Sequence, residues 1–131
     1  ADMIYRLRQQ KPVWALCNDT ACSAAMLLAS ACSRRLVTQT SRIGSIGVMM
    51  SHVSYAGHLA QAGVDITLIY SGAHKVDGNQ FEALPAEVRQ DMQQRIDAAR
   101  RMFAEKVAMF TGLSIDDIEK LKNDMHVEKQ A

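Results

Sequence analysis

Ser23 stands where a short apolar run gives way to a helical pattern, a position from which a serine can act as a nucleophile. Residues 13–17 predict a buried strand, residues 18–20 a turn with helix-capping side chains, and residues 22–33 a helix. The start of a helix offers unpaired backbone N–H groups and the positive end of its dipole, which stabilise a seryl oxygen or an oxyanion. Position alone is a weak signal, because a serine there is more often a simple cap.

Cys22 is a rival nucleophile, because a thiol at a helix start can have a lowered pKa. Neighbouring residues on a helix are turned by about 100°, so Cys22 and Ser23 cannot both face one cleft. With Cys17 and Cys32 the chain has three cysteines, spaced like neither a zinc ribbon nor a redox Cys-x-x-Cys pair. We therefore expect three free thiols in a reducing compartment.

Lys75 is the candidate base for Ser23, in the loop Ser-Gly-Ala-His-Lys-Val-Asp-Gly of residues 71–78. A lysine accepts a proton only when burial lowers the pKa of its ammonium group. Loops at strand ends are where open α/β sheets hold ligands, and Ser71 could orient the amine. A lone loop lysine is nevertheless more often merely exposed.

The four histidines are the alternative bases: His52, His58, His74 and His126. None has an acidic partner in a known triad order. His58 falls in a predicted helix and His126 near a polar tail, which favours structural or solvated roles. Only His74 lies in a loop with the character of a reaction site.

The elements that must position these residues alternate along the chain. The predicted strands are residues 13–17, 36–38, 48–50 and 65–70. The predicted helices are residues 2–10, 22–33 (buried nearly all round), 55–62 ending at Gly63, a long amphipathic one from Pro85 to Gly112, and a last one capped by Ser114. This alternation indicates an α/β fold with crossover connections.

The composition is that of an ordinary globular chain. It has 131 residues, 48% of them hydrophobic, and a net charge of +1, which suits one domain over residues 1–131 and gives no sign of a nucleic-acid partner. No segment approaches the length needed to span a membrane, and residues 1–8 lack the apolar stretch of a secretory signal. The start on a charged helical segment without Met suggests a fragment of a longer domain.

Long stretches of the sequence match one enzyme family in content and order. They are residues 11–16 (Lys-Pro-Val-Trp-Ala-Leu), 27–31, 33–40, 44–50 (Gly-Ser-Ile-Gly-Val-Met-Met) and 68–79, which contains Ser-Gly-Ala-His-Lys. On these segments the chain resembles the serine peptidases of the signal peptide peptidase A (SppA) type, from residue 11 to about residue 118. The nearest branch is that of the lambda protein C-like phage capsid or prohead proteases.

The resemblance implies a Ser-Lys dyad in which Ser23 is the nucleophile and Lys75 the general base, with no metal or cofactor. The cleft would be bordered by a wider set of residues: Ala24, Gly44, Ser45, Ile46, Gly47 and Ser71. The implied fold is α/β, a ClpP/crotonase-like β-β-α superhelix without the family's N-terminal strands. The family forms rings or domes, so we expect a homo-oligomer with shared active sites that processes scaffold protein or other peptide substrates. Its place would be the bacterial host cytoplasm or the phage procapsid.

Two other functions stay open from the sequence. The family's upstream Pro-Gly-Gly turn, which completes its oxyanion hole, has no match in this sequence, and Ser23 is followed by Ala24, Ala25 and Met26 where the family commonly has glycine. These departures fit a catalytically inactive prophage remnant or assembly module that keeps the fold. A crotonase-like enzyme acting on acyl thioesters would share the fold, but the Ser/Lys pair and the lack of paired carboxylates argue against it.

Overall fold

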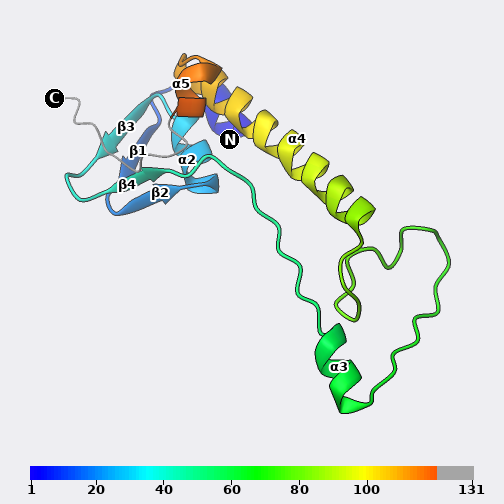
Figure 1. Ribbon diagram of the computed structural model, residues 1–131. Helices are drawn as coiled ribbons and strands as arrows, with labels where there is room; N and C mark the ends of the chain where they lie inside the picture. The colour runs from blue at the N-terminus through cyan, green and yellow to red at the C-terminus, as the bar shows by residue number, and fades with distance from the viewer. Residues whose placement is uncertain (121–131) are drawn as a thin grey trace. The chain divides into compact units, whose positions relative to one another are not determined.

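The computed structural model of the chain, shown in Figure 1, describes residues 1–120. The chain forms two compact units, which are described separately below. The first unit contains Ala1–Val48 and the chain from Ala99 onward, and the second contains Met49–Ala98. The long helix α4, Ala86–Thr111, contributes residues to both units.

Two pairs of parallel strands form the sheet structure of the first unit. Strand β1, Trp14–Cys17, pairs with β3, Arg34–Val37, and β2, Thr20–Cys22, pairs with β4, Arg42–Gly44. In the sequence, helix α2, Ala24–Ser30, lies between the two partners of each pair and forms part of the crossover connection that parallel strands need. The expected α/β fold with crossover connections is confirmed at this level.

Two small clusters of buried side chains hold these elements together. The first joins α4 to α5, Ile115–Lys120, through Phe103, Ala104, Val107 and Ile118, and Leu27 and Ile46 pack against it. The second lies under the strands and α2 and consists of Cys17, Ala21 and Ala29, with Ala15 and Ile43 against it. Burial of each large apolar side chain here stabilises the fold by about 1.5–3 kcal/mol.

The helix ends of the first unit follow the sequence signals closely. Gly112 adopts a left-handed φ of 76° after α4, as its place after the last helical residue predicts. Ser114 Oγ then accepts a hydrogen bond from the Asp117 N–H at 3.0 Å and so caps α5. The N-terminal helix α1, Asp2–Leu7, is tied to α4 by an ion pair between Lys106 Nζ and Asp2 Oδ1 at 2.7 Å.

The second unit contains helix α3, Ala56–Ala62, a series of turns and the first half of α4. Gly63 ends α3 with a left-handed φ of 68°, as predicted. Asn79 organises the turns: its amide donates to the Val76 carbonyl and the Glu82 carboxylate, and its carbonyl accepts from the Phe81 N–H. These bonds fix the segment that leads into α4.

Several details of the predicted secondary structure are wrong. Residues 20–22, predicted as the end of a turn and the start of a helix, form strand β2 instead. Residues 48–50 and 65–70 are not strands, because neither pairs with another segment of residues 1–120, although 65–70 has a strong β-propensity. Such a propensity measures how well side chains fit a half-buried sheet, and Ile69 is 95% exposed here. Helix α2 is buried only in part, since Ala24, Ala25 and Leu28 are exposed on one side.

Candidate active site

Ser23 lies at a sharp junction between strand and helix. It follows the last residue of β2 and stands directly before α2, with φ 55° and ψ −122°. Few residues other than glycine adopt these angles, so the backbone is strained at this serine. The side chain is exposed and makes no capping hydrogen bond to α2, so a simple capping role does not account for it. A strained, exposed serine between strand and helix is the arrangement of a nucleophile elbow.

The glycine-punctuated loop begins directly beside Ser23. Cys22 pairs with Gly44 in the parallel register of β2 and β4, and the Ser23 N–H donates to the Gly44 carbonyl at 2.9 Å. Ser45 directly follows the last residue of β4, as Ser23 directly follows the last residue of β2, and both serines have a φ of 55°. Two strained serines therefore stand at the carboxyl ends of two adjacent strands, which is where parallel sheets hold their ligands.

The rest of this loop is held by a tight turn and by the core. The Gly47 N–H donates to the Ser45 carbonyl at 3.0 Å, which closes the turn, while Ile46 packs against the cluster around Phe103. Ala24 directly follows Ser23 in the sequence and is exposed. Its N–H lies in the first turn of α2, where no helical acceptor exists. The first unit thus brings the predicted cleft residues 44–47 and Ala24 to the nucleophile candidate.

Lys75 and Ser71 belong to the second unit, in the run of turns between residues 71 and 78. The turn is closed by a hydrogen bond of 3.2 Å from the Lys75 N–H to the carbonyl of Gly72, whose φ is 107°. Both side chains are exposed, and within residues 1–120 no hydrogen bond joins Ser71 Oγ to Lys75 Nζ. The burial that a lysine base requires is therefore not provided by the second unit itself.

His74 has an acidic partner that the sequence-based reasoning missed. Its Nδ1 lies 2.9 Å from Asp77 Oδ2, and the imidazole is largely exposed beside Lys75. A carboxylate on one ring nitrogen orients the other, so His74 is a rival candidate to Lys75 for the base. The spacing of three residues within one turn could have suggested this contact. His52 Nε2 instead bonds the Asn79 carbonyl at 2.8 Å, and His126 lies outside the described residues.

The thiol of Cys22 lies against the neighbouring strand β4. Its Sγ approaches the Arg42 carbonyl of β4 at 3.7 Å, and the residue is half-buried. Cys17 is buried, and desolvation raises the pKa of its thiol, with smaller influences from Cys32 and Arg35. All three cysteines are free, as the sequence predicts.

The described part of the chain contains no group of three or more His, Cys, Asp or Glu side chains placed to hold a metal ion. None of its helices is both long and apolar enough to cross a membrane.

Comparisons with known proteins connect this geometry to a family. The model of peptidase family S49 matches residues 5–131. The chain is 97% identical over 118 residues to the head-tail preconnector protein GP5 of Enterobacteria phage P21, which covers 90% of this chain and 24% of that protein. It is 64% identical over 115 residues to the capsid assembly protease C of Escherichia phage lambda, which covers 88% and 26%. The chain thus spans about a quarter of the length of these two relatives.

Proposed function

The chain belongs to peptidase family S49, on its phage capsid-protease branch, and we propose that it carries the Ser-Lys catalytic core of a serine endopeptidase. The observation that carries the proposal is Ser23, a strained and exposed serine at a strand-to-helix junction beside Gly44. The proposed role is the processing of scaffold or other capsid proteins in the procapsid or the host cytoplasm. Its support is that one relative is named a capsid assembly protease and another a head-tail preconnector protein.

In the proposed mechanism the neutral amine of Lys75 takes the proton from Ser23 Oγ, and the oxygen attacks a peptide carbonyl carbon. The N–H of Ala24, which has no acceptor within α2, donates to the oxyanion of the tetrahedral intermediate. The intermediate collapses to an acyl-enzyme as the leaving amine takes the proton from Lys75. Water then gives a proton to Lys75 while its oxygen attacks the acyl carbon. As the bond between the acyl carbon and Ser23 Oγ breaks, Lys75 returns this proton to Oγ, which releases a carboxylic acid and restores both residues.

The exposure of Lys75 sets a condition on this mechanism, because a lysine acts as a general base only where its amine is desolvated. We propose that assembly supplies the missing burial, and that the working site is shared between subunits of a homo-oligomer. Strong exposure of apolar side chains in the second unit supports an assembled state: Met49 is 83% and Ile69 95% exposed.

We also propose that the fold is the ClpP/crotonase-like β-β-α superhelix, with residues 1–131 as one peptidase core within a longer domain. The order β1, β2, α2 in the first unit is one β-β-α unit, and β3 and β4 repeat its two strands with the same parallel pairing. This repetition supports the proposal.

The test of the nucleophile and base is covalent labelling with a fluorophosphonate followed by peptide mapping. We expect the label on Ser23, no label in Ser23→Ala, and strongly reduced labelling in Lys75→Ala. Cys22→Ala and His74→Ala are the matched controls, because each removes the rival group beside the proposed one and should still be labelled. A label that survives Lys75→Ala but disappears in His74→Ala would replace the dyad with a Ser-His mechanism.

The test of shared sites is complementation between two inactive variants. Ser23→Ala and Lys75→Ala chains are mixed, unfolded and refolded together, and assayed for peptide hydrolysis. If Ser23 of one copy works with Lys75 of another, random mixing restores up to about a quarter of the wild-type activity. Should both residues of a site come from one copy, the mixture stays inactive, and the shared-site proposal is wrong even if the dyad is correct.

One observation favours a second function, that of an inactive assembly module: Lys75 is exposed in its own unit, which does not supply the desolvation that a lysine base requires. This alternative predicts oligomers by light scattering whose size is unchanged in Lys75→Ala and which are never labelled at Ser23. Labelling of the assembled wild-type chain excludes it.

A further inference from the structure

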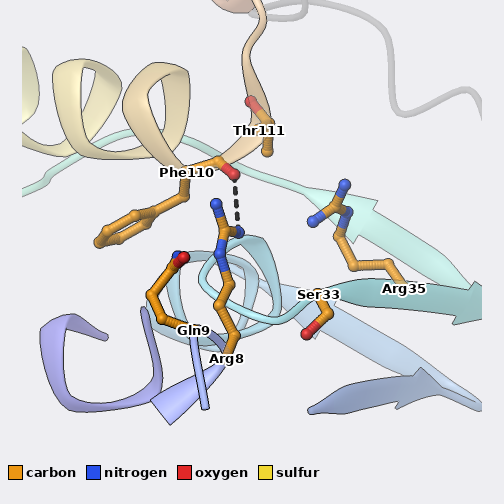
Figure 2. A pocket seen from close by; sticks show the side chains of 6 residues that line it. All are labelled: Arg8, Gln9, Ser33, Arg35, Phe110 and Thr111. Atoms are coloured by element: carbon orange, nitrogen blue, oxygen red, sulfur yellow. Dashed lines mark hydrogen bonds between the residues drawn. The ribbon is translucent and has the colours of Figure 1, made fainter. Parts of the chain in front are cut away.

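We propose that a hollow at the end of α2 opposite Ser23 binds carboxylate groups of a polypeptide. Its volume is about 380 Å3, and Figure 2 shows the residues that line it: Arg8, Gln9, Ser33, Arg35, Phe110 and Thr111. All of them belong to the first unit. Ser23 directly precedes α2 whereas Ser33 follows its end, so the hollow is separate from the candidate active site.

Two arginine side chains stand side by side in the hollow. Arg8 Nη1 and Arg35 Nη1 both donate to the Cys32 carbonyl, at 3.2 and 3.3 Å, so a single oxygen atom holds the two guanidinium groups together. Neither arginine forms an ion pair with a carboxylate of residues 1–120. Two adjacent positive charges without a counterion among the described residues make a site for an anion.

Both guanidinium groups are fixed before any ligand arrives. Arg8 Nη1 also donates to the Phe110 carbonyl at 2.9 Å, drawn as the dashed line in Figure 2, and its guanidinium lies 4.2 Å from the centre of the Tyr5 ring. Arg35 Nη1 donates to the Ser30 carbonyl at 3.3 Å. These bonds use only Nη1 of each arginine, which leaves the Nε–H and Nη2–H groups for a ligand. Such preorganisation lowers the entropic cost of binding.

The remaining lining groups suit an anion as well. Ser33 Oγ accepts from the Val13 N–H at 3.0 Å, so its own proton is free to be donated, and Gln9 offers an amide NH2 group. No lining residue is acidic. The carbonyl ends of α2 and α4 carry partial negative charges of about half an electron each. Arg35 Nη1 already donates to a carbonyl at the end of α2, and Arg8 Nη1 to one at the end of α4. Two full positive charges outweigh them.

A carboxylate fits this arrangement because its two oxygens match the fork of a guanidinium group. The choice of a polypeptide as its source rests on the proposed function, since a peptidase meets polypeptide chains, whereas the anion chemistry rests on the hollow alone. An acidic segment of a substrate bound here would be held by a surface separate from the cleavage site.

The experiment is a calorimetric titration of the 131-residue chain, carrying Ser23→Ala to prevent cleavage, with acetyl-Glu-Glu-Glu-amide. Acetyl-Gln-Gln-Gln-amide is the neutral control peptide. Arg35→Gln removes one cation from the hollow, and Arg34→Gln is its matched control: the neighbouring residue loses the same charge but does not line the hollow and lies over Trp14. We expect Arg35→Gln to weaken binding about tenfold or more, and Arg34→Gln to change it less than about twofold.

Several results would overturn the proposal. These are no binding of the acidic peptide, equal binding of the neutral peptide, or equal losses in the two arginine variants. Arg35-dependent binding of inorganic phosphate without binding of the acidic peptide would reject the carboxylate ligand. If Arg35→Gln does not fold, Arg35→Lys replaces it as the test. This variant keeps the positive charge but loses the forked guanidinium group, so the proposal requires it to bind the acidic peptide more weakly. Fluorophosphonate labelling of the wild-type chain reports separately on the proposed peptidase function, so that function and the carboxylate-binding proposal can fail independently.

Discussion

Replacing Ser23 by glycine should make the protein more stable while removing its proposed nucleophile. At φ 55° and ψ −122° the serine backbone carries a strain of about 1–3 kcal/mol, which a glycine does not carry. Glycine loses more backbone entropy on folding, at a cost of about 0.5–1 kcal/mol. The serine hydroxyl makes no capping bond and its side chain is exposed, so little else is lost. The free energy of unfolding should therefore rise by about 1 kcal/mol.

The assay is urea-induced unfolding followed by circular dichroism, together with thermal unfolding, where the expected rise in Tm is about 3–5 °C. Ala24→Gly is the matched control, because the next residue is exposed and helical and should lose about 0.5–1 kcal/mol. Ser23→Ala keeps the strain and should stay within about 0.5 kcal/mol of the wild type. If Ser23→Gly is destabilised as much as Ala24→Gly, Ser23 is not strained, and the elbow interpretation fails.

Three further predictions follow from contacts of single residues. Burial raises the pKa of the Cys17 thiol, so the folded state holds this proton more tightly than the unfolded chain does. The free energy of unfolding should therefore fall as pH rises above about 9. In thermal unfolding, Cys17→Ala should make this pH dependence weaker. The pKa of the Asp2 carboxyl is lowered chiefly by its hydrogen bond from Lys106, so Lys106→Gln should raise the Asp2 pKa in an NMR titration. The contribution of this pair to the stability of the folded state should disappear as pH falls through the Asp2 pKa. Gly78→Ala should destabilise the folded state by about 1–2 kcal/mol in urea unfolding, because Gly78 has a φ of 73°. Gly57→Ala in α3 is the comparison: an added Cβ there meets no atom within 4 Å, so this variant should be as stable as the wild type or more stable.

The parts of the fold that depend on local chemistry could be predicted from the sequence. Gly63 and Gly112 end their helices with left-handed backbones, and Ser114 caps α5 through its own hydroxyl. Helix α4 was predicted from the three- and four-residue spacing of apolar side chains such as Phe103 and Val107, both of which are buried. In each case the residues that decide the structure are near neighbours in the chain.

Strand pairing could not be read in this way, because a strand depends on a partner far along the sequence. Residues 65–70 have a strong β-propensity and yet pair with no other described segment, while Thr20–Cys22, read from the sequence as a turn and the start of a helix, forms β2 against β4. The strain at Ser23 was missed for the same reason. Its type and position predict a cap, and only the pairing of Cys22 with Gly44 shows that the chain turns sharply there.

The small cluster around Phe103 also bears on when the site can form during synthesis. Leu27 lies a few residues after Ser23 and Ile46 directly after Ser45, and both pack against side chains that reach as far along the chain as Ile118. A nascent chain still on the ribosome lacks those side chains until translation has passed residue 118. The surroundings of the candidate nucleophile are therefore incomplete until residue 118 has been translated, so Ser23 is made long before its packing neighbours are.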